Sequence, residues 1–327
     1  MKSAIVHAAG ESDVVTINKE ADKPSPSADQ VLVQVAYAPL NPLDTHARAN
    51  RIAWNHPGFP FVPGFEFCGR VMEVGDEANN HLIGSRVAAN AVWGGNAEFA
   101  VAPARSLVAI PDSFNWQLGA TFSTCAYTAW HLVNSALTLR SGDTLVVHSA
   151  AGAVGSLVMQ IAHDKGVTVI GLVGSDDKRD FAKQHGADHV INYRDEDWAQ
   201  QVQSLTGGGA NAIIDGNAGP NAANNYAAIA PLGEIVYLGA MGGKAAPADI
   251  SMLIGKSIAV KGFVQYFYQA RSKGSENAEI FAKLADGSWQ IPIGKIYDLD
   301  DVAEAHRAFE ARELTGRTLI RVGGDSI

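Results

Sequence analysis

The chain has 327 residues, more than one compact core usually serves, so we expect two domains. With 47% hydrophobic and 18% charged residues it has the composition of a folded globular protein and not of a disordered one. A net charge of −9 argues against a nucleic-acid or anionic-membrane partner, and two cysteines are too few for a disulfide framework or a four-thiolate zinc site.

The N-terminus meets polar residues before an apolar signal segment can form, and no run of about 18 apolar residues occurs. We therefore expect neither secretion nor membrane insertion. The expected location is the cytoplasm, with small molecules as the main partners.

Up to about residue 110, short β-rich runs such as 31–36, 69–74 and 98–101 alternate with Pro and Gly. That spacing predicts an irregular antiparallel barrel. From about Leu118, helical stretches alternate with apolar strands, a pattern typical of βαβ units and a parallel sheet. These strands are expected at 144–147, 167–172, 189–191, 212–214 and 234–238.

Near Lys256 the pattern changes again, to a strand at 257–263, helices at about 275–286 and 300–312, and a closing strand at 318–322. The fold class is therefore α/β. The simplest architecture inserts a doubly wound nucleotide-binding domain, residues 124–262, into a β-rich domain formed by residues 1–123 and 263–327.

The segment His148-Ser-Ala-Ala-Gly-Ala-Val-Gly155 lies where an apolar run turns into a helical pattern. Small residues let the backbone approach a dinucleotide's pyrophosphate, and the helix N-terminus offers free N–H groups. Ala150 stands where the G-x-G-x-x-G pattern has its first glycine, so the motif alone leaves an ordinary strand-to-helix turn open. The candidate cofactor-binding residues here are Ala150, Gly152, Ala153, Val154 and Gly155.

The order of motifs along nearly the whole chain resembles the medium-chain dehydrogenase/reductase superfamily, and within it the zinc-free quinone oxidoreductase (zeta-crystallin-like) branch. The resemblance implies a GroES-like substrate domain with a Rossmann insert. It rests on Asn41-Pro-Leu-Asp44, Val62-Pro-Gly-Phe-Glu-Phe-Cys-Gly69, Gly84-Ser-Arg-Val87, Ala97-Glu-Phe-Ala-Val-Ala-Pro103, Ala150–Gly155, Gly186-Ala-Asp-His-Val-Ile-Asn-Tyr193, Tyr237-Leu-Gly-Ala240, Ala305-His306 and Thr315-Gly-Arg317.

Zinc-dependent relatives carry Cys three residues before the Asp, and His before the Glu, whereas this chain has Asn41 and Phe65 there. Neither replaces a thiolate or an imidazole, and Cys125, near the remaining ligand position, cannot form a tetrahedral site alone. We therefore expect no zinc. Without a Lewis acid, the acceptors expected are quinones and α,β-unsaturated carbonyls, which delocalise the charge left by hydride addition.

An NAD enzyme of this fold has an acidic residue at the tip of the second strand, and Gly174-Ser175 stands there instead. The resemblance implies that Gly174, Lys178 and Tyr193 hold the 2′-phosphate of NADPH, with Ser175 as an extra donor. A solvated helix start is the alternative for residues 176–179, but it does not explain the missing acid. We expect NADPH.

Other candidates follow from the resemblance or from position. Asn41 and His46 are the catalytic candidates, with a turn and a surface histidine as their structural alternatives. Further cofactor-binding candidates follow the fourth and fifth Rossmann strands: Asn217, Gly239, Ala240 and Met241. The substrate-pocket candidates are Trp54, Trp93, Tyr266 and Phe267, aromatic residues that can equally pack a domain junction or a dimer contact.

The sequence thus predicts an NADPH-dependent, zinc-independent reductase of quinones or other conjugated carbonyls. A reductase of 2-enoyl thioesters or of alkenals and enones is the nearest alternative, and a non-enzymatic, crystallin-like NADPH-binding protein is an alternative of another class. The resemblance further implies a homodimer formed through the Rossmann domain.

Overall fold

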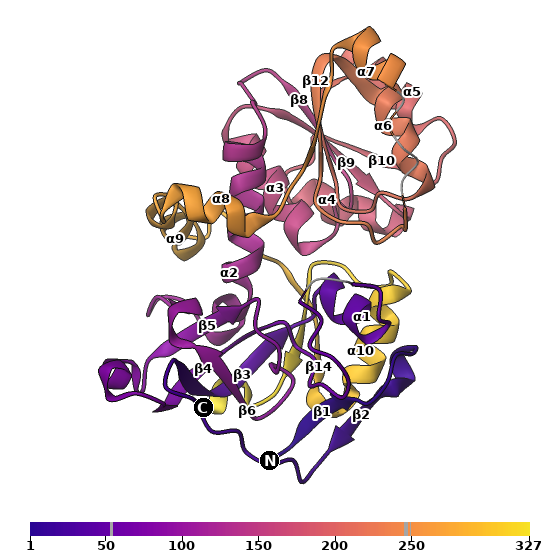
Figure 1. Cartoon of the computed structure of the whole chain (residues 1–327). Helices are drawn as coiled ribbons and strands as arrows, with labels where there is room; N and C mark the ends of the chain where they lie inside the picture. The colour runs from indigo at the N-terminus through magenta and orange to yellow at the C-terminus, as the bar shows by residue number, and fades with distance from the viewer. Residues whose placement is uncertain (53–54, 245–247, 249) are drawn as a thin grey trace. The chain divides into compact units, whose positions relative to one another are not determined.

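The computed structural model describes residues 1–52, 55–244, 248 and 250–327, so that Trp54, an expected pocket residue, lies outside the described residues. The chain forms two units, one made of Met1–Thr124 with Ile293–Ile327 and the other of Cys125–Pro292. Figure 1 traces the elements of both units. No helix of the described residues is long and apolar enough to cross a membrane.

The first unit is built on a seven-stranded sheet in the order β14-β15-β3-β4-β5-β7, with β6 paired to β3. A separate antiparallel pair joins β1 to β2. The bounds are β1 Ser3–Val6, β2 Val15–Asn18, β3 Gln30–Pro39, α1 Pro42–Arg48, β4 Glu66–Val74, β5 Arg86–Asn90, β6 Phe99–Pro103, β7 Leu107–Ala109, β14 Ile293–Asp298, α10 Val302–Glu310 and β15 Arg317–Arg321.

The β-rich domain predicted from the strand spacing is present, with one departure from the expected antiparallel pattern. Strands β14 and β15 are parallel. Helix α10 lies between them in the chain, and a crossover of this kind is what parallel neighbours require. The core of the unit includes Val31, Val33 and Val35 of β3, whose β-branched side chains are fully buried.

The second unit contains a six-stranded sheet in the order β10-β9-β8-β11-β12-β13, in which every neighbouring pair is parallel. Numbered along the chain, this is the strand order 3-2-1-4-5-6 of a Rossmann fold. The bounds are β8 Thr144–Val147, α3 Ala153–Asp164, β9 Thr168–Val173, α4 Arg179–Gln184, β10 His189–Asn192, α5 Trp198–Thr206, β11 Ala210–Asp215, α6 Ala223–Ala228, β12 Ile229–Tyr237, α7 Ile250–Lys256 and β13 Ala259–Gly262.

Apolar sequence explains why these strands form the centre of the unit. In β9 every residue after Thr168 is buried, as expected for a parallel strand covered on both faces. Helices α3 to α7 alternate with the strands along the chain (Figure 1). The doubly wound sheet predicted from the alternation of helices and apolar runs is therefore confirmed.

The unit boundary differs from the expected return to the first domain after residue 262. Helices α8 (Gln265–Ser272) and α9 (Asn277–Ala285) belong to the second unit. The reason is a set of bonds from helix α2 (Trp116–His131): Tyr127 Oη donates to Asn277 Oδ1 at 2.7 Å, and Trp130 Nε1 donates to Glu279 Oε2 at 2.7 Å. These polar partners are far apart in sequence and carry no local signal.

His306 on α10 is a buried titratable residue of the first unit. Its side chain is fully buried, and neither ring nitrogen has a hydrogen-bond partner among the described residues. Burial, together with the charge of Arg48, lowers the pKa of His306 from 6.5 to about 3. The folded state therefore holds this imidazole neutral across the range where the unfolded state becomes protonated.

We predict that His306→Leu flattens the acid side of the stability profile. The unfolded state binds a proton at His306 near pH 6.5 and the folded state near pH 3, so wild-type stability falls as pH drops through this window, by at most about 1.4 kcal/mol per pH unit. The leucine variant does not lose stability in this way as the pH falls, and the substitution removes no hydrogen bond of the described residues. Urea unfolding at pH 7.5 and 5.5 measures the difference; identical pH dependence in both proteins would contradict the prediction.

Candidate active site and dinucleotide site

Asp44 joins helix α1 to the segment before β4. Helix α1 begins at Pro42, whose fixed φ suits a first helical position. The backbone N–H of Asn41 donates to Asp44 Oδ2 at 2.8 Å, while Gly64 and Phe65 donate their N–H groups to Oδ1, each at 2.9 Å. Burial raises the pKa of Asp44 to about 6, although these three backbone donors favour its charged form.

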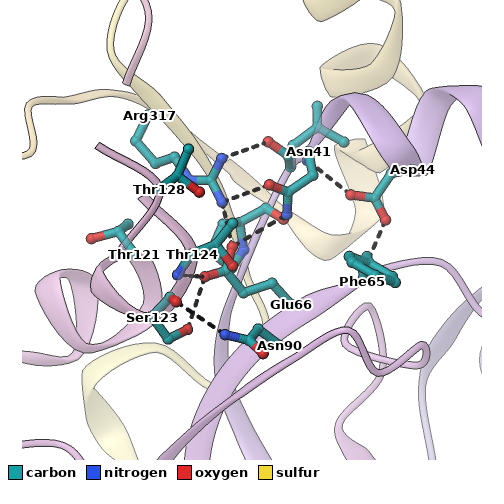
Figure 2. Close-up of polar contacts among 12 residues, drawn as sticks. Asn41, Asp44, Phe65, Glu66, Asn90, Thr121, Ser123, Thr124, Thr128 and Arg317 are labelled. Carbon is teal, nitrogen blue, oxygen red and sulfur yellow. Dashed lines mark hydrogen bonds and ion pairs between the residues drawn. The ribbon is translucent and has the colours of Figure 1, made fainter. Parts of the chain in front are cut away.

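A buried ion pair lies beside this helix start. Glu66 is fully buried at the first position of β4, and Arg317, the first residue of β15, donates from Nη2 to Glu66 Oε2. Arg317 Nη2 also donates to Asn41 Oδ1 at 3.0 Å, and Asn41 Nδ2 donates to Glu66 Oε2 at 3.3 Å (Figure 2). The three side chains thus form a closed triangle of contacts.

The second oxygen of Glu66 is bound by helix α2. Ser123 Oγ donates to Glu66 Oε1 at 3.0 Å, and the backbone N–H of Thr124 donates to the same atom at 3.1 Å. Asn90 Nδ2 in turn donates to the carbonyl of Ser123 at 3.0 Å (Figure 2). Because both oxygens are satisfied, the buried carboxylate tolerates its loss of hydration.

Of these residues only Asn41 was predicted from the sequence as a site residue, whereas Glu66, Arg317 and Ser123 were not. Glu66 and Arg317 lie in two of the segments that carry the family resemblance, Val62–Gly69 and Thr315–Arg317. A glutamate inside an apolar strand was the available signal, since charged residues are rarely buried without a partner. The partner, 251 residues away along the chain, had no comparable signal.

The two catalytic candidates, Asn41 and His46, lie at the N-cap of helix α1 and within that helix. Asn41 precedes α1 and is 6% exposed, with its amide bonded to Pro39 O, Glu66 and Arg317. His46 lies further along α1 and is half-buried. Burial, aided by the charge of Arg51, lowers the pKa of His46, so its imidazole is mainly neutral at pH 7.

Aromatic rings occupy the surroundings of Phe65, the residue at the position of a zinc-binding histidine. The Phe65 ring lies 4.9 Å from that of Trp93, which lies 5.5 Å from Phe61. Phe65 is buried, and Trp93 Nε1 donates to Asn55 O at 2.8 Å. Among the described residues no group of three or more His, Cys, Asp or Glu side chains is placed to hold a metal ion. These residues do not fit zinc.

The glycine-rich turn of the second unit connects β8 to α3. Gly152 is the N-cap of α3 and has no side chain that could cap the N–H groups of the first turn. A Cβ on Gly155 would lie 2.4 Å from Ser149 O, which requires glycine at that position. Ala150 is fully buried, and its methyl group faces Gly171 of β9, where a Cβ would lie 2.9 Å away. Ala150 thus fits at this position because Gly171 on the neighbouring strand has no side chain.

Gly174 and Tyr193 form a close contact at the tips of β9 and β10. A Cβ on Gly174 would lie 2.7 Å from Tyr193 Oη, so a larger residue would displace the phenol. Lys178 and Ser175 follow Gly174, both half-buried. Arg179 is committed elsewhere, because it donates to Asp176 Oδ1 and to Val190 O. The phenol and ammonium groups of Tyr193 and Lys178 suit a phosphate monoester.

The remaining cofactor candidates follow β11 and β12 at the same edge of the sheet. Asn217 Nδ2 donates to Ser149 Oγ at 2.9 Å, which links the turn after β11 to the glycine-rich turn. Gly239, Ala240 and Met241 follow β12, and a Cβ on Gly239 would lie 2.7 Å from Gly216 O. The carboxyl ends of these parallel strands therefore bring the candidates together, as a Rossmann sheet requires.

Two pocket candidates lie on α8. The Phe267 side chain is 73% exposed, and Tyr266 is half-buried. Of the two cysteines, Cys125 is buried in α2 and Cys68 in β4, where Cys68 Sγ donates to Trp116 O at 3.4 Å. Burial raises the pKa of Cys68 to about 12, which makes this thiol unreactive.

A GroES-like sheet unit and a Rossmann unit in one chain define the class of the medium-chain dehydrogenases and reductases. Family models agree: residues 27–112 match the alcohol dehydrogenase GroES-like domain and residues 153–281 match the zinc-binding dehydrogenase model. A quinone oxidoreductase of Pseudomonas aeruginosa is 30% identical over 300 residues, which is 90% of this chain and 92% of that protein. That of Rattus norvegicus is 27% identical, covering 94% and 93%.

Solved structures agree with these relatives. A mycobacterial protein complexed with NADPH matches with a TM-score of 0.90 and 28% identity, covering 98% of this chain and 99% of that one. A quinone oxidoreductase of Pseudomonas syringae matches with a TM-score of 0.90 and 29% identity, with 98% and 99% covered. The chain belongs to the zinc-free quinone oxidoreductase branch of the medium-chain dehydrogenase/reductase superfamily.

We predict that Arg317→Met destabilises the first unit by about 3–5 kcal/mol, because it leaves the Glu66 carboxylate buried without its counter-ion. The matched control is Arg321→Met on the same strand, which removes an exposed ion pair with Asp298 and has a much smaller effect. Urea unfolding of both variants measures the difference. Equal losses would mean that the buried pair is no more important than the exposed one.

Proposed function

We propose that the protein is an NADPH-dependent, zinc-independent reductase that transfers hydride to quinones or other conjugated carbonyl acceptors. The observation that carries the substrate class is Phe65, buried among aromatic rings at the position of a metal ligand. Without a metal the acceptor must delocalise its own negative charge, as a quinone or an enone does.

The contact of Gly174 with Tyr193, together with the neighbouring Lys178, supports NADPH over NADH. The position at the tip of β9 that an acidic residue takes in NAD enzymes is held by Gly174, so the ribose 2′-hydroxyl has no carboxylate partner there. When bound, NADPH supplies the hydride. The bare N-terminus of α3 holds its pyrophosphate through backbone N–H groups.

His46 is our candidate for donating a hydrogen bond to the acceptor oxygen, and the proton that completes the reduction comes from water. A lowered pKa keeps its imidazole neutral near pH 7, and a neutral imidazole still offers one N–H. Asn41 is proposed to act as a positioning residue. Its side-chain amide is hydrogen-bonded to Glu66 and Arg317, and these bonds orient the start of α1, the helix that carries His46. Trp93 is proposed to contribute to an acceptor pocket on the first unit, and Tyr266 and Phe267 are retained as pocket candidates of the second unit.

A reductase of alkenals, enones or 2-enoyl thioesters is the nearest alternative, because such acceptors also form a delocalised enolate after hydride addition. A non-enzymatic, crystallin-like protein that binds NADPH is the alternative of another class. Acceptor turnover distinguishes all of these.

We also propose a homodimer formed through the Rossmann unit and located in the cytoplasm. Strand β13 is at the edge of the six-stranded sheet, where it presents unpaired backbone groups. Val260 on this strand and Val264 just after it are 37% and 43% exposed. Pairing of two copies along β13 would cover both side chains.

We predict that Lys178→Ala weakens NADPH binding by about tenfold or more while NADH binding stays nearly unchanged, because only NADPH has a 2′-phosphate to bond the ammonium group. Lys183→Ala, an exposed lysine on α4, is the matched control and leaves both affinities unchanged. Fluorescence titration with each dinucleotide measures the effect. A parallel loss for NADH would contradict a phosphate role for Lys178.

We predict that steady-state NADPH oxidation is fastest with 1,4-benzoquinone and 9,10-phenanthrenequinone in a panel that also holds an acrolein-type enal and crotonyl thioester. A quinone needs least help, since the reduced product carries its charge as a phenolate. Turnover of the thioester alone would favour the alternative reductase. Tight NADPH binding without turnover of any acceptor would favour the non-enzymatic protein.

A further inference from the structure

A chain of buried side chains lies beneath the turns that follow β8 and β11. Asp215, the last residue of β11, and Asn225 on α6 are fully buried, and His148, the first residue after β8, is 4% exposed. His148 Nε2 donates to Asn225 Oδ1 at 2.8 Å, and Asn225 Nδ2 donates to Asp215 Oδ2 at 2.8 Å. The amide of Asn225 therefore bridges the ends of two neighbouring strands.

The other oxygen of Asp215 holds the backbone of the turn after β11. Its Oδ1 accepts the N–H groups of Asn217 at 2.8 Å and Ala218 at 2.9 Å. Because the carboxylate is buried, these bonds are not weakened by competition with water. The same turn continues to the loop after β12, since Gly242 N–H donates to Asn217 O at 2.6 Å.

Both turns contain a residue in the left-handed region of backbone space. Ser149 has φ +53° and Ala218 has φ +50°, values that L-residues other than Asn and Asp rarely adopt. Such a conformation is unfavourable for these residues and persists only when surrounding contacts hold it. Ser149 directly follows His148, and Ala218 is bonded to Asp215, so the buried chain is attached next to each of these residues.

The two turns are also joined to each other by a hydrogen bond between their own side chains. Asn217 Nδ2 reaches Ser149 Oγ at 2.9 Å, so the two turns are joined a second time on the side away from the buried chain. A left-handed Ser149 also brings its carbonyl oxygen to 2.4 Å from where a Gly155 Cβ would stand, which packs the turn against the start of α3. The buried hydrogen bonds among His148, Asn225 and Asp215 thus help to set the backbone conformation of the glycine-rich turn.

We propose that Asp215, Asn225 and His148 are positioning residues for the dinucleotide: their buried hydrogen bonds hold the turns after β8 and β11 in the strained conformation that receives it. This inference rests on the proposed NADPH dependence. None of the three is assigned a contact with the cofactor. Their loss therefore weakens binding of the dinucleotide while leaving hydride transfer in the saturated enzyme nearly unchanged.

The test uses Asn225→Asp, which replaces the donor facing Asp215 by a second carboxylate oxygen. We expect the Kd for NADPH, measured by fluorescence titration, to rise about tenfold or more, with KM for NADPH rising in parallel and kcat changing by less than about threefold. Asn211→Asp is the matched control. Asn211 joins the same two strands at their other end, where its Oδ1 accepts from Thr144 N–H, and its replacement leaves Kd unchanged.

An exchange of the two side chains provides the rescue. In Asp215→Asn/Asn225→Asp the donor and acceptor trade places, His148 Nε2 still finds an oxygen, and we expect Kd to return to within about threefold of wild type. Ala218→Gly in the Asn225→Asp background recovers part of the affinity, because glycine adopts φ near +50° at little cost. If Asn225 served only the stability of the unit, Asn225→Asp protein that is folded would bind NADPH with the wild-type Kd, and there would be no affinity to recover.

Failure of the two proposals can be told apart. Wild-type protein that does not bind NADPH would overturn the proposed function, whereas tight wild-type binding with an unchanged Kd in Asn225→Asp would overturn only the positioning role. If Asn225→Asp does not fold, hydrogen exchange of NADPH-free wild type decides. We expect the amides of Asn217 and Ala218 to be protected, and exchange at the rate of an unprotected peptide would overturn the inference.

Discussion

The contact of Glu66 with Arg317 is the constraint on which the first unit depends. Neither charge is tolerable in the interior alone, so the fold must bring β4 and β15 together and must also supply Asn41 and Ser123 to complete the hydrogen bonds. Four segments from distant parts of the sequence are thereby held in one arrangement. The start of α1, which carries the candidate catalytic residues, is fixed by the same contacts.

Each unit uses a buried aspartate in the same way. Asp44 accepts the consecutive N–H groups of Gly64 and Phe65 on one oxygen, and Asp215 accepts those of Asn217 and Ala218. Two adjacent amides pointing at one carboxylate oxygen fix the local backbone more tightly than a single bond does. In both units the backbone held in this way belongs to a segment of the candidate site, although neither aspartate was predicted from the sequence to have a role.

The residues at the zinc-ligand positions and the proposed choice of acceptor are connected by one physical reason. Phe65 fills with aromatic surface a position that a metal site would need for an imidazole, and the amide of Asn41 is used up by Glu66 and Arg317. In the function proposed here, charge developing on the acceptor is spread by the acceptor itself or met by a hydrogen-bond donor, for which His46 is the candidate. Both requirements favour conjugated carbonyl substrates.

The sequence by itself determined the fold class, a parallel sheet of apolar strands and the glycine-rich turn, because periodicity and small residues are local signals. Its resemblance to the family supplied the NADPH candidates Gly174, Lys178 and Tyr193. Only the tertiary structure decided that α8 and α9 belong with the Rossmann unit, and that Glu66 finds Arg317. It alone also revealed the His148–Asn225–Asp215 chain. Those partners meet through long-range packing of polar side chains, and a single buried Asp, Asn or His carries no pattern that names its partner.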